Sequence, residues 1–508
     1  MYSHLLRVLA FTLLTPLAIA TYPLSLGNSY NHNPSYNKPI NFYTTLTPLL
    51  SPSAQVITPS SPLFPTYTHQ NLKSHPPQYS VVVAVATERD VSLAIQFANK
   101  HDIPFAAKVS GHGTWAGLGE MKGGMNIWLR GLNSVTLSKD GRTAVVGGGT
   151  MVDEVVKVLW AGGKQTATAL GQCIGITGSG IGGGLGPLMG VYGLGLDQFV
   201  GFRVVLANGT VVGASREENA ELFWGLRGAG HNFGVVTEVT VKVYDREGQS
   251  DWVYRQMVFG GEKVEEVFEA INGKLDGQPG HLSHDASIYQ GADGAVLDLR
   301  VFSNRFDAAQ LEKYVESFLW LGPLENSTTL VTDYMGLIKE MGYDAPAGGC
   351  GLPTGSFGSV FGVGVTNHVP SAMRKLYDLF DELTTSVPEL GGSYIFIEGY
   401  GTEAVQSVPE ASTAWAHRHI RAWPNVVLAY RAEEINPTLE KTVAEWGEKL
   451  RAAMLEGQEK QESYVNYAVK QESLKALYGY DAWRLEKLRR LKKAVDPKSR
   501  FGFFAPVH

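Results

Sequence analysis

Three glycine-rich segments lie close together in this chain and constrain its fold more than any other feature. They are KVSGHGT at Lys108–Thr114, GSGIGGGLG at Gly178–Gly186 and RGAGHNFGVVTEV at Arg227–Val239. Glycine has no Cβ, so its backbone N–H groups can approach a pyrophosphate directly. We therefore expect these segments to enclose a flat or phosphorylated ligand. The first segment places one histidine, His112, between two glycines.

The glycine run GSGIGGGLG also contains the G-x-G-x-x-G spacing of a dinucleotide-binding fold, at Gly178, Gly180 and Gly183. That motif requires a strand before it, a helix after it and an acidic residue about 20 residues further on. Here TATALGQCIGITG, before the run, is typical of a loop, and PLMGVYGLG follows it. Three glycines and a proline in that second segment argue against a helix, so we expect no dinucleotide-binding fold.

The size and charge of the chain are those of a two-domain globular enzyme. At 508 residues it can bury a large core, with 44% hydrophobic and 18% charged residues. The net charge is −6 at pH 7, and the sequence has no basic stripe typical of nucleic-acid-binding proteins. We therefore expect a small-molecule substrate and no nucleic-acid partner.

The first 20 residues are expected to be a secretion signal. MYSHLLR is a weakly basic start, VLAFTLLTPLAIA is an apolar core too short to span a bilayer, and Ala18–Ala20 fits a cleavage site. A buried N-terminal strand is the alternative. No other stretch of the sequence is long and apolar enough to cross a membrane, so we expect a secreted or luminal protein without stable membrane association.

Two sequons and two cysteines are relevant to the expected secretion of the protein. The sequons are Asn208–Thr210, in a predicted hairpin turn, and Asn326–Thr328. The cysteines are Cys173 and Cys350. A chain of this size does not need a covalent staple, so we expect the two cysteines to be unpaired.

Residues 60–245 alternate short strands with helices. YSVVVAVAT predicts a strand, 88–101 an amphipathic helix, and 103–109 a second strand. This β-α-β unit ends in the loop that contains His112. IWLRGLNSVTLS and TAVVGGGT predict further strands, 151–161 a helix, and FRVVLANGTVVGAS a hairpin. This pattern favours an α+β domain over a doubly wound sheet.

Residues 246–462 have fewer glycines and longer strands. SIYQGADGAVLDLRVF, GSVFGVGVT and SYIFIEGYG alternate with predicted helices at 308–321 and 371–385. This order predicts an antiparallel sheet with helices on one face. YVNYAV and SRFGFFAPV are again rich in glycine and aromatic residues, as in the first domain. We therefore expect residues 463–508 to complete that domain.

Motifs of one known family extend over nearly the whole chain after the signal. They are KVSGHGTWAG, NIWLRGLNSVTL, AVVGGGT, WAGGKQTATALGQC, GSGIGGGLGPLMGVYGLGLDQF, VVLANGTVV, ELFWGLRGAGHNFGVVTEV, TAWAHR, SYVNYAV and VDPKSRFGFFAPV. Together they resemble the fungal branch of the berberine-bridge-enzyme-like FAD-linked oxidoreductases, often found in secondary-metabolite pathways. The resemblance implies a two-domain α+β fold of the vanillyl-alcohol-oxidase (PCMH) type. It assigns 60–245 to the FAD domain, 246–462 to the substrate domain, and 463–508 to a C-terminal segment that completes the FAD domain.

The resemblance implies that FAD is bonded to His112 through the flavin 8α-methyl. The remaining cofactor contacts that it implies are Ser110, Gly111, Gly113, Thr114, Gly178, Gly182, Gly183, Asn232, Gly234 and Val236. Many relatives add a bond from cysteine to flavin C6. Aligned on Gly182–Gly184, this chain has Gly171 at that position and Cys173 two residues later. The alignment favours a single covalent bond, with Cys173 as a buried neighbour of the cofactor. A phosphate-binding loop without flavin is the alternative for Arg227–Val239.

The resemblance also implies where the chemistry occurs. Tyr464 and Asn466, in SYVNYAV, match a motif near the flavin ring, with Tyr464 as a candidate base, and Tyr192 matches a tyrosine that faces the active site. A phenolate needs stabilising neighbours to act near neutral pH. Relatives carry a carboxylate or glutamine on the strand after the TAxxHR motif, whereas this chain departs from the pattern with Val427.

The implied activity is oxidation of a small molecule. The substrate C–H gives hydride to flavin N5, a base takes a proton, and O2 reoxidises the flavin to yield H2O2. Two alternatives stay open: a carbohydrate oxidase, and a flavoprotein cyclase whose flavin is mainly structural, which Val427 in place of a base supports. No Cys or carboxylate cluster accompanies His417 and His419, so we expect no metal.

Overall fold

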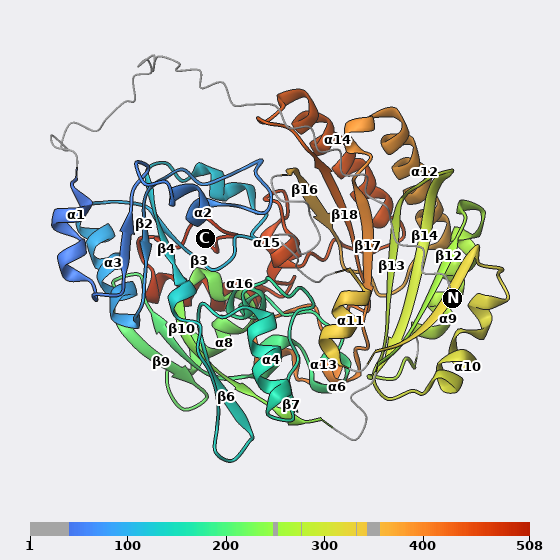
Figure 1. Cartoon of the computed structure of the whole chain (residues 1–508), viewed down its shortest axis with the longest axis horizontal. Coiled ribbons are helices and arrows are strands. Elements are labelled where there is room, and N and C mark those ends of the chain that lie inside the picture. Colours follow the sequence, from blue (N-terminus) through green and yellow to red (C-terminus); the bar gives the residue numbers. More distant parts are fainter. Residues whose placement is uncertain (1–39, 247–251, 276, 332, 343–355) are drawn as a thin grey trace, which may run out of the picture. The chain divides into compact units, whose positions relative to one another are not determined.

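A computed structural model describes residues 40–246, 252–275, 277–331, 333–342 and 356–508 of the chain (Figure 1). Phe42–His508 form one compact unit. The predicted signal sequence and Cys350 lie outside the described residues. The strands of this unit form three larger sheets and one two-stranded sheet, and helices pack between and around them, which confirms the predicted α+β class.

A four-stranded sheet with the order β1-β2-β4-β3 carries the first glycine-rich segment. Its strands are β1 (Gln55–Ile57), β2 (Tyr79–Ala84), β3 (Phe105–Lys108) and β4 (Gly124–Trp128). Helix α3 (Glu88–Lys100) joins β2 to β3, and it starts at Thr87, whose side chain accepts a hydrogen bond from Asp90 N. This β-α-β unit was predicted, and it delivers the chain to His112 directly after β3.

A five-stranded antiparallel sheet follows, with the order β5-β6-β10-β8-β9. Its strands are β5 (Val135–Leu137), β6 (Thr143–Gly147), β8 (Phe199–Val205), β9 (Val211–Ser215) and β10 (Val235–Lys242), and β7 (Lys164–Gln165) pairs with β11 (Tyr244–Asp245). The predicted hairpin is confirmed as β8 and β9, and its turn contains Asn208. The helices of this region are α1 (Phe42–Thr45), α2 (Phe64–Thr68), α4 (Val152–Ala161), α5 (Ile176–Ile181), α6 (Met189–Tyr192), α7 (Gly195–Gln198) and α8 (Ala220–Ala229).

The segment after residue 251 forms a seven-stranded antiparallel sheet with the order β15-β12-β14-β13-β17-β18-β16. Its strands are β12 (Trp252–Phe259), β13 (Leu282–Gly291), β14 (Gly294–Ser303), β15 (Glu325–Val331), β16 (Phe357–Gly362), β17 (Tyr394–Gly399) and β18 (Trp423–Tyr430). Helices α9 (Val264–Leu275), α10 (Ala308–Leu319), α12 (Pro370–Ser386) and α14 (Pro437–Met454) cover one face (Figure 1). Side chains such as Ile395 and Ile397 pack against them, so the neighbouring positions on β17 point to the opposite face.

Two local predictions were wrong. IWLRGLNSVTLS was expected to be one strand, but a 3-10 turn at Leu129–Gly131 interrupts it. The backbone of Gly131 packs so closely on Val85 that an added Cβ would lie 2.1 Å from the Val85 carbonyl oxygen. The segment around GIGGGLG forms the short helices α5, α6 and α7 where loop was expected. Glycine has a low helix propensity, but tertiary packing outweighs it at Gly180. A Cβ added at this position would lie 2.2 Å from the Phe199 ring, so the helix packs closely there.

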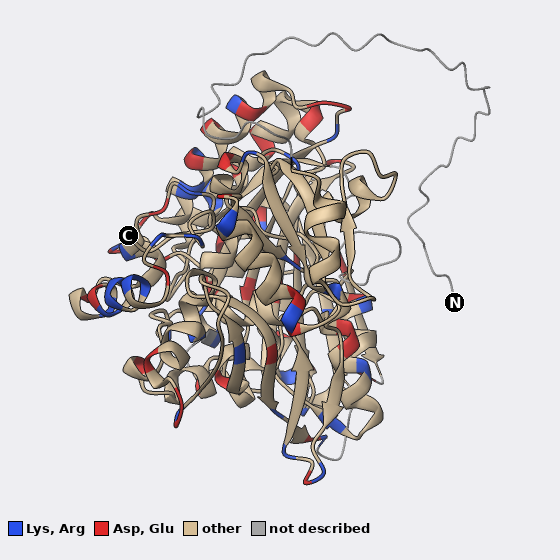
Figure 2. Ribbon diagram, turned by 90° about the vertical axis from the view of Figure 1, so that its left-hand side faces the viewer, with Lys and Arg blue, Asp and Glu red and all other residues tan. Residues whose placement is uncertain are grey.

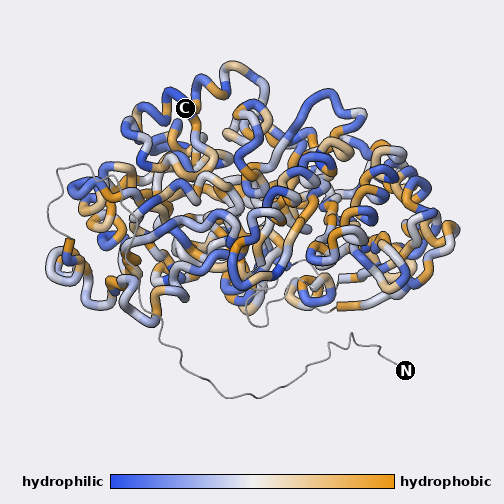
Figure 3. Tube along the Cα trace, turned by 90° about the horizontal axis from the view of Figure 1, so that it is seen from above, coloured by the Kyte–Doolittle hydropathy of each residue, from blue (hydrophilic) through white to orange (hydrophobic). Residues whose placement is uncertain are grey.

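The remaining helices are α11 (Tyr334–Glu340), α13 (Glu403–Ser407), α15 (Leu474–Tyr478) and α16 (Ala482–Val495). Hydrophobic and hydrophilic residues alternate along the helical segments, as amphipathic packing requires (Figure 3). Acidic and basic residues are interspersed along the ribbon (Figure 2). In the part of the chain that the structure describes, no helix is both long and apolar enough to cross a membrane.

Candidate active site

A cavity of about 430 Å³ gathers residues from all parts of the compact unit. The glycine-rich segments contribute Lys108–Thr114, Gly178, Ser179 and Gly234–Val236. The uncovered face of the seven-stranded sheet contributes Val360, Tyr394, Phe396, Glu398 and Val427, and later segments contribute Tyr464, Asn466, Tyr467, Phe501, Phe503 and Phe504. The cavity therefore joins the region predicted to bind a cofactor to the face of the sheet predicted to bind substrate.

The His112 loop forms one wall of this cavity. Gly111 has φ +88°, and a Cβ there would lie 2.7 Å from the Lys108 side chain, so the turn requires glycine. His112 Nδ1 lies 3.0 Å from Ser110 Oγ. Burial, reinforced by the nearby His69 and Lys108, lowers the pKa of His112 to about 4. The imidazole is therefore neutral at physiological pH, which is the form that can act as a nucleophile.

Cys173 contacts the same imidazole. Its Sγ lies 3.5 Å from His112 Nε2. Cys173 is disulfide-bonded, so the expectation of unpaired cysteines was wrong. That expectation rested on chain size, and a chain that can fold without a disulfide can still form one. A disulfide sulfur carries no thiolate, so this state agrees with the prediction that Cys173 is not bonded to a cofactor.

The second glycine-rich segment has two different roles. Gly178 lines the cavity, and a Cβ added there would meet nothing within 4 Å, so this position leaves room for a ligand. Gly182 and Gly183 were expected to bind the cofactor, but neither is among the described lining residues. A Cβ at Gly182 would lie 2.2 Å from Asn466 Oδ1, and one at Gly183 would lie 2.7 Å from Tyr464. These two glycines therefore allow close packing of protein side chains.

The third segment also divides. Gly234 and Val236 line the cavity as expected. Asn232 does not: its Oδ1 accepts a hydrogen bond from Val507 N at 2.9 Å, and its Nδ2 donates to Tyr478 Oη at 3.2 Å. Asn232 is fully buried, and it anchors the segment that places Phe501 and its neighbours at the cavity wall.

Tyr464 and Asn466 line the cavity, and they form hydrogen bonds with each other and with the second glycine-rich segment. Tyr464 Oη accepts hydrogen bonds from Gly184 N at 3.0 Å and Asn466 Nδ2 at 2.7 Å. Burial raises the pKa of Tyr464 well above its usual value. The phenol is thus held neutral and is occupied by protein donors.

Tyr192 lies elsewhere. It is not among the described residues that line the cavity. Its hydroxyl accepts a hydrogen bond from Gln165 Nε2 at 2.9 Å, and its ring stacks on Tyr244 with centroids 3.9 Å apart. The described cavity therefore gives no support to the prediction that Tyr192 faces the active site, since its ring packs against Tyr244 of β11.

The sequence analysis missed a tyrosine–carboxylate pair at the cavity. Tyr467, only half-buried, donates a hydrogen bond to Glu398 Oε2 at 2.9 Å, and Tyr400 donates to Glu398 Oε1 at the same distance. Burial raises the pKa of Glu398 to about 7. A glutamate within the apolar strand YIFIEG was the available signal, since a buried carboxyl needs a reason to be there.

The position of Val427 explains the departure from the family pattern. Val427 lines the cavity on β18 and pairs with Tyr394 of β17. The carboxylate is therefore supplied by the neighbouring strand, two positions beyond Phe396. Among the described residues, no group of three or more His, Cys, Asp or Glu could hold a metal ion.

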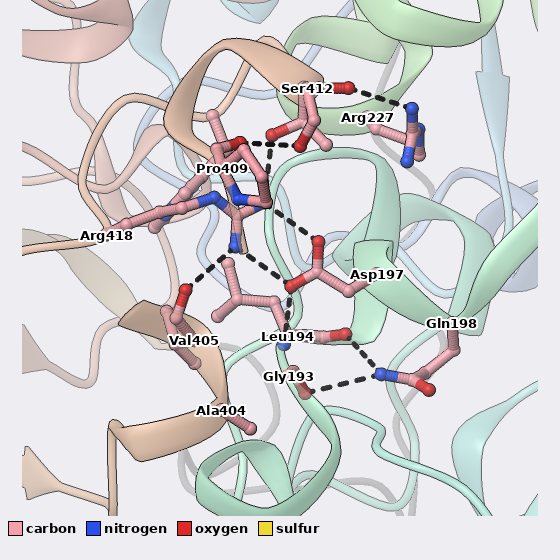
Figure 4. A network of polar contacts seen from close by, with 12 residues as sticks. Gly193, Leu194, Asp197, Gln198, Arg227, Ala404, Val405, Pro409, Ser412 and Arg418 are labelled. Atoms are coloured by element: carbon pink, nitrogen blue, oxygen red, sulfur yellow. Dashed lines mark hydrogen bonds and ion pairs between the residues drawn. The ribbon is translucent and has the colours of Figure 1, made fainter. Parts of the chain in front are cut away.

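A buried ion pair joins segments that lie far apart in the sequence (Figure 4). Arg418 Nη2 and Nη1 donate to the two carboxylate oxygens of Asp197 at 2.8 and 3.0 Å. Asp197 also accepts a hydrogen bond from Leu194 N at 3.0 Å, and Arg418 donates to Thr413 Oγ1. The pair ties α7 to the segment that leads into β18.

Comparison with known proteins gives consistent matches. Residues 79–215 match the family "FAD binding domain". The FAD-linked oxidoreductase chry5 of Gibberella zeae is 34% identical, over 92% of this chain and 94% of that protein. Because this relative aligns with nearly the whole chain, the assignment to the FAD-linked oxidoreductases does not rest on residues 79–215 alone.

Solved structures show the same fold. Wild-type BBE-like 1 of Physcomitrella patens aligns with a TM-score of 0.78 at 20% identity, covering 90% of this chain and 96% of that one. The glucooligosaccharide oxidase of Acremonium strictum aligns with a TM-score of 0.77 at 20% identity, covering 89% of this chain and 96% of that one, and it carries a 6-S-cysteinyl, 8α-N1-histidyl FAD. The chain therefore belongs to the berberine-bridge-enzyme-like FAD-linked oxidoreductases and has their vanillyl-alcohol-oxidase-type fold.

Proposed function

We propose that this chain is a secreted oxidase that carries FAD on His112 and oxidises a small, largely apolar organic molecule of the secondary-metabolite type. The observation that carries the proposal is the cavity itself. It contains the neutral His112 imidazole and the hydrogen-bonded Tyr467–Glu398 pair in one continuous space. Such an oxidation needs a residue that holds the flavin and a base that deprotonates the substrate. The His112 imidazole can do the first, and the Tyr467–Glu398 pair can do the second.

The residues present fit FAD. The His112 loop and Gly178 leave backbone exposed to the cavity, and Gly178 opens into free space. Val236 and Phe504 add apolar surface. When bound, FAD supplies the hydride acceptor and passes the electron pair on to O2, which yields H2O2. Ser110, Gly111, Gly113 and Thr114 remain the proposed pyrophosphate contacts.

The chain's own residues provide the proton transfer. Tyr467 lines the cavity, and its hydroxyl donates a hydrogen bond to Glu398. As the hydroxyl oxygen takes a proton from the substrate, the phenol proton passes to the carboxylate. Because the pKa of Glu398 is about 7, the carboxylate becomes available as the pH rises through neutrality.

The covalent attachment can be tested without a substrate. Acid-precipitated wild-type protein should stay yellow, and His112→Ala should give a colourless precipitate, because only a covalent bond survives denaturation. Cys173→Ser is the matched control and should keep its colour, since His112 alone holds the flavin. A colourless wild-type precipitate would contradict the attachment.

The lining favours this function over the two alternatives. Val360, Phe396 and Val427 form an apolar wall on the sheet side, where a sugar oxidase would need polar groups for hydroxyls. The cyclase alternative drew its support from the absence of a base at Val427, and Glu398 removes that support. The deciding experiment is a screen of aromatic and alicyclic alcohols and amines against sugars, read by H2O2, followed by anaerobic bleaching of the flavin with each hit. A hit that gives product without bleaching would favour the cyclase.

Secretion is proposed from the N-terminal segment and is supported by two exposed sequons. Asn208 lies in the β8–β9 turn, where its Oδ1 accepts a hydrogen bond from Thr210 N at 2.9 Å. Asn326 lies on the edge strand β15, where Arg255 Nη2 donates to its Oδ1 at 3.0 Å.

We expect protein secreted from a eukaryotic host to carry N-glycans, with higher occupancy at Asn208, in a hairpin turn, than at Asn326, on a strand paired with β12. Endoglycosidase should lower the apparent mass, and Asn208→Gln should remove the larger part of the shift. An unchanged mass after digestion would argue against the secretory route.

A further inference from the structure

A row of charged side chains crosses the cavity-side face of the seven-stranded sheet and ends at Glu398. Arg300 of β14 is the register partner of Asp285 on β13, and Asp285 is the register partner of Glu398 on β17. Directly opposed residues share a face of the sheet. We propose that Asp285, held ionised by Arg300, is a positioning residue that keeps Glu398 protonated below neutral pH and thereby sets the pH at which the base becomes active. This inference rests on the proposed function of the Tyr467–Glu398 pair.

The charges in this row do not balance. Arg300 donates from Nε and Nη2 to Asp298 Oδ2 at 3.1 and 2.7 Å, and its Nη1 lies 3.5 Å from Asp285 Oδ1. Asp285 and Asp298 are fully buried, and Glu398 is 5% exposed. One guanidinium cannot compensate three buried carboxylates, so the row retains a proton at neutral pH.

The environment of each carboxyl decides where that proton resides. Asp298 has two charge-assisted hydrogen bonds and Asp285 has a nearby cation, whereas Glu398 has only the neutral phenols of Tyr467 and Tyr400. Burial raises the pKa of Asp285 to about 6, a rise that Arg300 opposes. Burial raises the pKa of Glu398 to about 7, and the Asp285 charge adds to that rise. Asp285 therefore ionises first, and its charge delays Glu398.

The remaining groups around the pair are uncharged at neutral pH. Glu398 also faces Tyr464, and Asp285 faces Ser287 on its own strand, Tyr394 of β17 and Tyr254 of β12. Asp285 Oδ2 has no hydrogen-bond partner among the described residues. Among all these groups Arg300 is the cation, so Asp285 is the route by which its charge acts on Glu398.

The test is an infrared titration of the flavin-loaded, full-length protein at rest, which needs no substrate. The carbonyl band of a protonated buried carboxyl should disappear near pH 7 in the wild type and be absent from Glu398→Gln. Asp285→Asn preserves shape and removes the charge, so the midpoint should fall by about one pH unit. Arg300→Gln should also lower it, because Asp285 without its cation stays protonated and no longer opposes ionisation of Glu398. Ser283→Ala, on the same face of β13, is the matched control and should leave it unchanged.

A lower midpoint in both Asp285→Asn and Arg300→Gln, against an unchanged midpoint in Ser283→Ala, would not follow from a general loss of packing. If Arg300→Gln does not fold, the comparison of Asp285→Asn with Ser283→Ala still decides. An unmoved midpoint in Asp285→Asn overturns this inference and leaves the base pair intact. Absence of any Glu398 band in the wild type, together with full activity of Glu398→Gln, would instead overturn the proposed function.

Discussion

Replacing Tyr467 by Phe should slow reduction of the bound flavin by about 10²–10⁴-fold, the usual contribution of a positioned base. The variant keeps the ring of a residue that lines the cavity and removes the hydroxyl that donates to Glu398 at 2.9 Å. Glu398→Gln should give a loss of similar size and should also abolish the rise in rate through about pH 7. Stopped-flow reduction under anaerobic conditions, with a substrate from the peroxide screen, measures both.

Tyr464→Phe is the matched control for this prediction. It comes from the same motif, but its oxygen is occupied by Gly184 N and Asn466 Nδ2, so its loss should affect the rate much less. All three variants should keep acid-stable yellow colour, because none contacts the His112 attachment. The assignment fails if Tyr464→Phe is slow while Tyr467→Phe reduces its flavin at the wild-type rate.

Asp197→Asn should lower the free energy of unfolding by about 3–5 kcal/mol, the cost of leaving a buried charge without its partner. Arg418 is 4% exposed, and Asp197 accepts two of its hydrogen bonds (Figure 4). Denaturant titration of the flavin-loaded protein gives the difference.

A double replacement separates the two contributions to that cost. Asp197→Asn combined with Arg418→Met removes both charges and should recover a large part of the stability, because a buried pair is worth less than the penalty of breaking it. A double variant as unstable as the single one would show that packing around α7, and not the unpaired guanidinium, sets the loss.

The sequence was most informative where one residue type has one physical role. The glycines around His112 and the side-chain patterns of β2, β8 and β9 predicted the loop and the strands correctly, because backbone geometry and side-chain period determine both. The run Gly182–Gly184 was misread for a physical reason. Glycine permits close approach of a ligand and of a protein side chain equally well, and only the positions of Tyr464 and Asn466 show which one occurs.

The base could not be assigned from the sequence for a similar reason. Tyr464 and Tyr467 stand in the same short motif, and Glu398 precedes Tyr467 by 69 residues. Which phenol reaches a carboxylate depends on how β17 packs beneath that motif, and this register is a tertiary property. A carboxylate was sought on β18, whereas the fold supplies it from the adjacent strand.

The wall formed by Phe501, Phe503 and Phe504, pinned by Val507 N on Asn232, has a consequence for biosynthesis. Residues 501–507 emerge from the ribosome some 390 positions after His112, roughly 20–80 seconds later at ordinary elongation rates. The pocket is incomplete until then, so cofactor loading follows translation. A fusion partner joined directly after these residues would compete with that closure, and a purification handle is better placed elsewhere.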